Sequence, residues 1–406
     1  MQKYKDMIFI NMEKKNPLIN LASDYKPKEK YGQKWYPYID KKDSLPEQLI
    51  NLSYNCATHG SLISSKIDDL CGLGLTSDNK RTRDYLLKAN KYGESWNKLY
   101  RKLASDLVVF GGYAEDLQFS KNHKTIENIY HVPFFKLRIG DVDGYGNITS
   151  LYYGNKFKGY LESDKPIERS VYSLDNKEPT QINYEGIYSW GNCVYPLPSY
   201  YPCLDDIRIA YEISEFQLAM TQNGMYPSMM ITLLNGDPGE DKQEKIYDDF
   251  QARLRGTNNA GSWLINFANS KDEAPIITPL TQPKMADLFD TIDKRSQQNI
   301  LTGHKVISPM LAGVKTEGQL GGATELMNAY QIQMNRTIEP MKEILLSTIN
   351  KILEFNGYKE ATIIDNSPVK FTFSENILTQ ILTEDELRNM IGFDPKEPTQ
   401  AQNNIQ

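Results

Sequence analysis

The segment from Asp141 to Tyr152, DVDGYGNITSLY, begins like a calcium-binding loop, because its first and third residues are aspartates and its sixth is glycine. Calcium also takes oxygen ligands from the fifth and twelfth positions of such a loop, which are Tyr145 and Tyr152 here. The segment therefore lacks the negative charge that calcium needs. Its Asp-Gly and Gly-Asn pairs predict the turn of a β-hairpin instead.

The histidines and cysteines are spaced unlike those of catalytic or metal sites. No histidine has a second one three or four residues away, and no GxSxG or HExxH motif occurs, which disfavours serine hydrolases and zinc hydrolases. The cysteines form no CxxC pair, so we expect buried free thiols. These residues are His59, His123, His131, His304, Cys56, Cys71, Cys193 and Cys203.

One predicted helical face carries Asp287, Asp290 and Asp293, which could imitate a metal cluster. Lys294 and Arg295 adjoin this face, so a solvated helix surface is the better interpretation. We predict that the chain is not an enzyme and has no metal site and no cofactor.

Two helical patterns flank a glycine-rich loop in the second half of the chain. The first covers 285–303, with Leu288 and Ile292 at helical spacing and a glycine at its end. The second is interrupted by Pro340, which removes one backbone hydrogen bond and predicts a bend near Glu339. Its apolar stripe is Leu326, Tyr330, Met334, Ile338, Met341, Leu345, Ile349 and Ile352.

The rest of the chain predicts an α+β fold. One or two helices are expected over 46–72, a helical stretch over 81–110 and strands with turns over 114–195. An amphipathic helix should follow and end at Asn223-Gly224, with apolar positions Ile209, Ile213, Phe216 and Met220. MMITLL, WLINFAN, PIITPL and VKFTF are predicted strands, EDKQEKIYDDFQARLRG and LTEDELRNMIGF predicted helices, and KEPTQAQNNIQ a disordered tail.

Charge and composition exclude some functions. The 46 basic and 52 acidic residues give a net charge of −6, without the basic excess or patch of a protein that grips DNA phosphates tightly. The same charge suits a conduit whose wall lets a polyanion slide, and also an ordinary acidic protein. Without an apolar run long enough to span a membrane or a secretory signal, we expect a protein made in a cytoplasm.

Tyrosine is abundant, with 26 residues. The N-terminal segment YGQKWYPYI predicts irregular structure that packs on a neighbour. Aromatic residues interleaved with lysine can stack on single-stranded bases, but they more often anchor protein interfaces. We therefore favour large contacts between protein subunits.

Five short sequence words, in order between residues 200 and 394, resemble those of tailed-bacteriophage portal proteins. The words are Tyr200-Tyr201-Pro202 with Asn223-Gly224; Gly256 to Gly261; Val306, Pro309, Met310, Leu311 and Gly313; Glu325, Thr337 and Pro340; and Thr383, Glu386, Arg388 and Gly392. Ser308 stands where that family usually has its first proline. The resemblance covers about half of the chain.

The resemblance implies a portal-like architecture with an α/β wing, two stem helices bracketing a small α/β clip, and a long kinked helix after a tunnel loop. The expected regions are 1–202 (wing), 203–224 and 285–303 (stem), 225–284 (clip), 304–321 (tunnel loop), 322–395 (long helix and completion of the wing with a short crown) and 396–406 (tail). The tunnel loop is punctuated by glycines, and its DNA-facing residues would be Gly313, Lys315, Glu317, Gly318 and Gln319.

The implied function is a ring, usually of twelve subunits, at one capsid vertex of the virion. Double-stranded DNA would pass through it without sequence specificity during packaging and ejection. The implied partners are the major capsid protein, the terminase large subunit and a head–tail adaptor, with no membrane, and assembly would occur in the bacterial host cytoplasm. A cytosolic enzyme with an unrecognised site and an unrelated oligomeric scaffold remain as alternatives.

Overall fold

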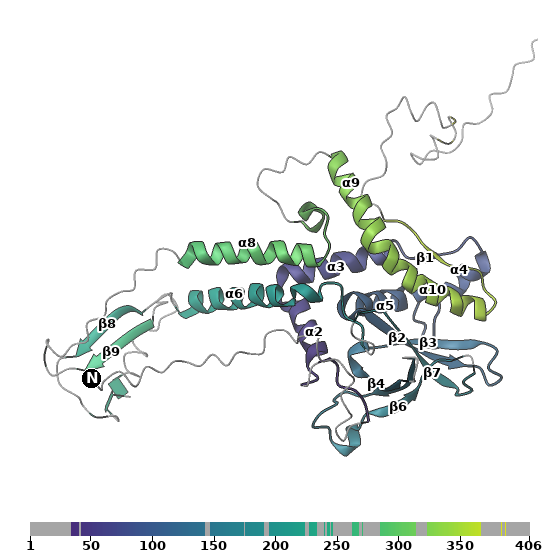
Figure 1. Ribbon diagram of the computed structural model, residues 1–406, viewed down its shortest axis with the longest axis horizontal. Coiled ribbons are helices and arrows are strands. Elements are labelled where there is room, and N and C mark those ends of the chain that lie inside the picture. The colour runs from purple at the N-terminus through teal and green to yellow at the C-terminus, as the bar shows by residue number, and fades with distance from the viewer. Residues whose placement is uncertain are drawn as a thin grey trace, which may run out of the picture. The chain divides into compact units, whose positions relative to one another are not determined.

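The computed structural model describes most of the chain between residues 34 and 366. The described residues are 34–39, 42–142, 147–173, 175–190, 195–223, 227–233, 239, 242–243, 245–246, 262–267, 270, 285–313, 323–366, 383 and 386. The chain divides into two compact units, Met1–Ile364 and Asp365–Gln406. The labelled helices and strands belong to the first unit (Figure 1).

Four helices supply much of the core of the first unit: α2 (Leu45–Asn55), α3 (Ala57–Cys71), α5 (Trp96–Phe110) and α10 (Glu339–Phe355). In α5, the Ser95 side chain caps the first turn by accepting a hydrogen bond from Lys98 N at 3.3 Å. Gly111 ends the helix in the left-handed region, at φ 81°, where a side chain would be strained. The apolar face between these caps is fully buried at Leu99, Leu103 and Leu107.

The helical stretch predicted over 81–110 is interrupted and forms two helices, α4 (Lys80–Leu86) and α5. Asn90 explains the interruption: its side chain accepts a hydrogen bond from Tyr92 N at 3.2 Å and donates one to Ile129 O at 3.1 Å. A side chain that satisfies backbone groups in this way competes with helix formation. Leu87, which looks like a core position in the sequence, is 70% exposed.

Two antiparallel three-stranded sheets follow α5, in the orders β3-β2-β7 and β4-β5-β6. Their strands are β2 (Gly112–Phe119), β3 (Ile126–Val132), β4 (Leu137–Val142), β5 (Ile148–Tyr153), β6 (Ile167–Ser170) and β7 (Thr180–Gly186). Strands β4 and β5 pair from Leu137↔Tyr153 to Val142↔Ile148, which confirms the predicted hairpin, although residues 143–146 lie outside the described range. The prediction of strands over 114–195 is thus confirmed.

The aromatic segment before α2 packs on its own chain, so the prediction that it packs on a neighbour is wrong for the residues described. Trp35 and Tyr38 are 3% and 0% exposed. Asp43 holds the segment in place, because its carboxylate accepts hydrogen bonds from Tyr38 N and from Arg138 Nε, both at 2.7 Å. Arg138 lies on β4, and both side chains of this ion pair are buried.

Two further helices, α6 (Leu204–Asn223) and α8 (Met285–Gly303), lie side by side and lead to the parallel strands β8 (Pro227–Leu233) and β9 (Ser262–Phe267) (Figure 1). The helix ends expected at Asn223 and Gly303 are confirmed, as are the strands in MMITLL and WLINFAN. In the helix predicted after residue 240, the described positions 242–243 and 245–246 are helical. The segments PIITPL and VKFTF and the tail lie outside the described residues.

The long C-terminal helix is irregular next to its proline. It comprises α9 (Ala323–Gln333), a π-helical turn over Met334–Ile338, and α10. In the π turn the Glu339 N–H donates to Met334 O, five residues back. The π turn lies directly before Glu339, where the sequence predicts a bend, and Pro340 sits in the first turn of α10, where its missing N–H costs little.

Two short strands complete the first unit: β1 (Leu75–Thr76) pairs with β10 (Thr362–Ile363).

In the second unit, Thr383 and Glu386 form a capping box, the pattern that starts a helix. Thr383 N and Thr383 Oγ1 each donate to Glu386 Oε2 at 2.8 Å, and Glu386 N donates to Thr383 Oγ1 at 3.4 Å. Among the described residues, no helix combines the length and the apolar character that crossing a membrane requires.

Candidate functional site at the root of the paired helices

Helices α6 and α8 run antiparallel in a defined register. Asn299 Nδ2 donates to Asp206 Oδ1 at 2.9 Å near one end of the pair. Ten residues further along α6, Phe216 contacts Phe289, ten residues earlier on α8, with ring centroids 5.3 Å apart. The two helices therefore form a two-helix rod whose root lies at Leu204 and Gly303.

The root of this rod is tightly packed on α3. A Cβ added to Gly303 would collide with Cys203 Sγ, so glycine is required for the helices to approach this closely. Cys203 Sγ donates to Tyr200 O at 3.1 Å, and Tyr200 is fully buried. On the other side, α3 contacts α8 and contributes His59 and Lys66.

His59 and His304 meet at this root, although 245 residues separate them in the sequence. His59 Nδ1 and His304 Nε2 are 2.8 Å apart, and both side chains are fully buried. The Tyr200 ring stacks on His304 with centroids 5.0 Å apart and contacts the edge of His59 at 4.5 Å. The predicted start of the tunnel loop, at residue 304, is thus anchored to α3.

The hydrogen bonds around the pair assign its tautomers. Ser53 Oγ donates to Leu49 O at 2.8 Å, so toward His59 Nε2, at 3.4 Å, it can only accept. His59 then carries its proton on Nε2, and its Nδ1 accepts from His304 Nε2–H. This leaves His304 Nδ1 as a buried acceptor with no partner among the described residues.

Burial dominates the electrostatics of the root and disfavours positive charge. It lowers the pKa of His59 from 6.5 to about 4, with a smaller contribution from the charge of Lys66. The pKa of His304 is lowered in the same way, first by burial and then by Lys66 and His59. Burial also lowers the pKa of Lys66 from 10.5 to about 7, and the neighbouring charge of Lys305 adds to this effect.

This arrangement is suited to holding two elements together. Burial raises the pKa of the Cys203 thiol to about 11, so it carries little of the thiolate that a nucleophile needs. Within the described residues, no group of three or more His, Cys, Asp or Glu side chains could hold a metal ion. Neutral histidines in this setting can donate, accept and stack, which makes the root a rigid polar joint.

The chain leaves the joint through a short ordered connector. Lys305 adopts φ 57°, and Val306 N donates to Leu301 O at 3.0 Å. A 3₁₀ turn over Pro309–Ala312 ends at Gly313, which has φ 74°. Four of the predicted tunnel-loop residues, Lys315, Glu317, Gly318 and Gln319, lie outside the described residues, so their placement stays a prediction.

The predicted stem residues lie in different environments. Ile213 is buried, whereas Ile209 and Phe216 are each 42% exposed and Ile292 is half-buried. The buried face of α6 instead runs through Leu204, Ile207, Ala210 and Ile213. Met220 and Leu288 lie in helices, but their side chains are outside the described set.

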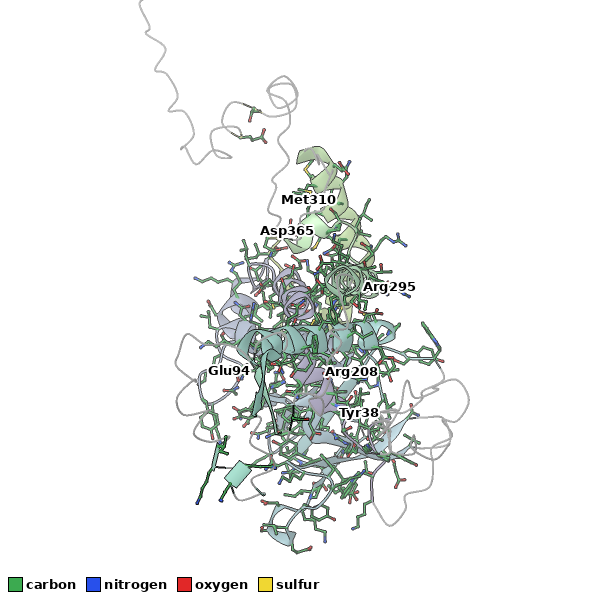
Figure 2. All side chains as sticks on the ribbon, turned by 90° about the vertical axis from the view of Figure 1, so that its left-hand side faces the viewer. Tyr38, Glu94, Arg208, Arg295, Met310 and Asp365 are labelled. Carbon is green, nitrogen blue, oxygen red and sulfur yellow. The ribbon has the colours of Figure 1, made fainter. Side chains whose placement is uncertain are left out.

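Sequence reasoning did not find the joint. The histidines were judged by local spacing, and spacing along the chain carries no information about a contact between α3 and the end of α8. Lys66 offered one signal: it falls in the apolar pattern of α3, on the same face as Leu62, Ile63 and Leu70. Figure 2 labels Arg208 on α6 and Arg295 on α8, one residue on each helix of the rod.

No protein-family model matches this chain. Over 184 residues the chain is 22% identical to a protein of Haemophilus phage HP1 (strain HP1c1) named probable portal protein, an alignment that covers 45% of this chain. The matched region spans about half of that relative, 51% of its length.

Chains in solved structures of gene transfer agent particles share the fold. A chain in the neck of an empty gene transfer agent (GTA) particle, computed with C6 symmetry, aligns with a TM-score of 0.53 and 13% identity over 86% of this chain and 94% of that one. A chain in the virion of a native GTA particle gives 0.53 and 12% identity, with the same coverage. The resemblance to tailed-bacteriophage portal proteins is confirmed, as is the mixed helix and strand fold.

Proposed function

We propose that this chain is a portal subunit that forms a closed ring around a channel for double-stranded DNA at one vertex of a virus particle. The observation that carries the proposal is the antiparallel α6–α8 rod. The rod joins the β8–β9 pair to the α/β body, by which we mean α2 to α5, β1 to β7, α10 and β10. The fold is shared with a GTA neck chain. The relative named probable portal protein supports the same assignment.

In this proposal the regions take the following roles. Residues 1–202 and 322–395 form the wing with a short crown, 203–224 and 285–303 the stem, 225–284 the clip and 304–321 the tunnel loop. Residues 396–406 form a tail. The exposed faces of α6 and α8, with Ile209 and Phe216, would then contact neighbouring subunits or line the channel.

Exposed aromatic residues support contacts between subunits. Tyr54, Tyr188 and Trp190 are 86%, 81% and 87% exposed in the single chain. Aromatic side chains with a polar group are enriched at protein interfaces, because they bury a large area at low entropic cost. These residues replace the buried N-terminal aromatics as the candidate interface residues.

The ring would act with partners and without catalysis of its own. The chain has no GxxxxGK[ST] motif, so the energy for packaging would come from a terminase motor docked on the ring. The other partners we propose are the major capsid protein and a head–tail adaptor. No cofactor is needed for this role.

The test of the ring is direct. The purified chain should form one closed cyclic species, such as a dodecamer, in mass photometry, and rings with a central hole should appear in negative-stain images. The variant Trp190→Ser should shift the population toward monomers if this side chain is in the interface. Only monomers or dimers at micromolar concentration, together with particles lacking a ring at a vertex, would refute the proposal.

The tunnel loop is tested separately. A ring of Lys315 side chains would touch passing phosphates briefly, while Glu317 would limit how tightly they are held. The variant Lys315→Glu should leave ring formation intact and lower the amount of packaged DNA, measured as DNA per particle. Lys177→Glu, an exposed position of the body, is the matched control. Normal DNA content in the Lys315 variant would remove this role.

A further inference from the structure

Positive charge is concentrated in one part of this acidic chain. Residues 80–102 contain eight basic residues and only two acidic ones, whereas the whole chain has a net charge of −6. All eight basic side chains are exposed: Lys80, Arg81, Arg83, Lys88, Lys91, Lys98, Arg101 and Lys102. The expectation that the chain carries no basic patch is therefore wrong for residues 80–102, although the charge of the whole chain is negative.

Part of this positive surface forms a groove of about 640 Å³ beside the first half of α5. Glu94 of its wall is labelled in Figure 2. Tyr92, in the wall, is 80% exposed, and Lys91 Nζ lies 5.3 Å from the centroid of its ring. The residues that line the groove are Tyr92, Gly93, Glu94, Lys98, Arg101, Lys102 and Ser105, and we call it the basic groove.

The cations of the basic groove are available to a ligand. Arg101 pairs with Asp68 and Lys102 with Glu94, each at 2.6 Å. Both basic side chains are about half exposed, although the Glu94 side chain is only 18% exposed; the exposed Arg101–Asp68 pair therefore contributes little, and Lys102 keeps N–H donors for a ligand besides the one that meets Glu94. Within the described part of the chain, Lys98 takes part in no ion pair.

We propose that the basic groove binds the backbone phosphates of double-stranded nucleic acid without sequence specificity. Lys98 and Lys102 lie one turn apart on α5, about 6 Å along the helix axis. This separation is close to that of alternate phosphates on one strand, which is about 7 Å along the duplex axis. The hydroxyl group of Tyr92 beside the cations is a further phosphate donor, whereas the Ser105 hydroxyl donates to Arg101 O at 2.7 Å.

The lining of the groove favours nucleic acid over an acidic protein surface. A protein partner is usually held by apolar anchors that fill a pocket. The basic groove has one large aromatic side chain, Tyr92, and otherwise small, charged or hydroxyl-bearing residues. Long cationic side chains with weak partners suit a uniform row of phosphates, for which counterion release supplies the affinity.

The experiment measures binding of a labelled duplex of roughly 20 base pairs by fluorescence anisotropy, over a series of salt concentrations. The groove variant combines Lys91→Gln, Lys98→Gln and Lys102→Gln. The control variant combines Lys121→Gln, Lys124→Gln and Lys177→Gln, three exposed lysines elsewhere that give the same change in charge. Far-UV circular dichroism and ring assembly of both variants are compared with the wild type.

We expect the groove variant to bind about tenfold or more weakly at low salt, and its slope of log K against log salt to be shallower by about 2 to 3. The control variant should match the wild type. Equal weakening in both variants, no duplex binding by the wild type at low salt, or equally strong binding of polyglutamate would each overturn the proposal. Because the groove lies outside the proposed channel loop, Lys315→Gln should leave this binding unchanged, so failure of either proposal can be recognised separately.

Discussion

Arg138 and Glu115 are both buried ionisable residues, but Arg138 has a partner of opposite charge whereas Glu115 has one weak hydrogen bond. Arg138 has a carboxylate partner and stacks on the Phe157 ring, 4.4 Å from its centroid. Glu115 is fully buried, with one weak hydrogen bond from Asn183 at 3.5 Å and no partner for Oε1 among the described residues. The first residue should stabilise the fold at neutral pH and the second should weaken it.

Arg138→Ala should lower the free energy of unfolding by about 3–5 kcal/mol, because it leaves the buried Asp43 carboxylate without its charge partner. The segment that carries Trp35 and Tyr38 should detach first, which tryptophan fluorescence in a urea titration would report. Arg101→Ala, which removes an exposed pair with Asp68, should cost less than about 1 kcal/mol. A similar cost for both variants would show that the buried pair does not hold the segment.

Glu115→Gln should stabilise the protein above neutral pH. Burial raises the pKa of Glu115 from 4.5 to about 7, and the charge of Glu185 adds to the rise. The folded state therefore binds this proton more tightly, and stability falls as pH rises from 4.5 to 7, by roughly 3 kcal/mol. Urea titrations at pH 4.5 and 8 should show this loss in the wild type and in Glu127→Gln, an exposed control, but not in Glu115→Gln.

At the scale of elements, the joint between α3 and the end of α8 couples the rod to the body. The His59–His304 contact, the Tyr200 stack and the approach of Gly303 to Cys203 all lie at this one position. The histidines of the joint are neutral, because burial disfavours their protonated, positively charged form. Its strength should therefore depend on pH.

His59→Gln should reduce the acid sensitivity of the joint. The pKa of His59 is lowered from 6.5 to about 4 by burial, so the stability it contributes is present above pH 6.5 and is lost as pH falls toward 4. The protection factors of the His304 and Val306 amides, which are exchange rates corrected for the intrinsic effect of pH, should fall over this range in the wild type and in His123→Gln, and fall less in His59→Gln. An identical fall in all three proteins would exclude the histidine pair as its cause.

At the scale of the whole molecule, the register of α6 and α8 brings Asn223, the last residue of α6, and Met285, the first residue of α8, to the same end of the rod. Replacing 225–284 with a short Gly/Ser linker should leave the body folded, because its core lies in the other elements. Far-UV circular dichroism and the melting temperature of the body should be retained, while docking of a motor or adaptor should fail. Replacing 148–170, which contains β5 and β6, should unfold the body; the same result for 225–284 would show that the proposed clip boundary is wrong.

Elements with a regular apolar pattern could be predicted from the sequence, and contacts between distant segments could not. The stripe from Leu326 to Ile352 is buried or half-buried as its spacing predicts. The break between α4 and α5 was missed because Leu87 continues the apolar pattern, while the backbone bonds made by the Asn90 side chain depend on a strand 39 residues away. The joint was missed for the same reason, since it combines residues that only the fold brings together. The basic groove was missed for another reason: its residues all lie between Tyr92 and Ser105, but the charge was considered over the whole chain.

The π turn before Pro340 also adjusts the phase of the long helix. The steps from Leu326 through Tyr330 and Met334 to Ile338 are each four residues, so in a uniform α-helix these positions would drift by about 120° around the axis. The five-residue bond at Glu339 absorbs one extra residue, so the stripe on α9 and the stripe on α10 both face the same core. Deleting one residue from 334–338 would restore a regular helix but rotate α9 by about 100° relative to α10, turning Tyr330 out of the core. The π turn therefore acts as a one-residue insertion between α9 and α10, and its length sets the direction in which α9 points.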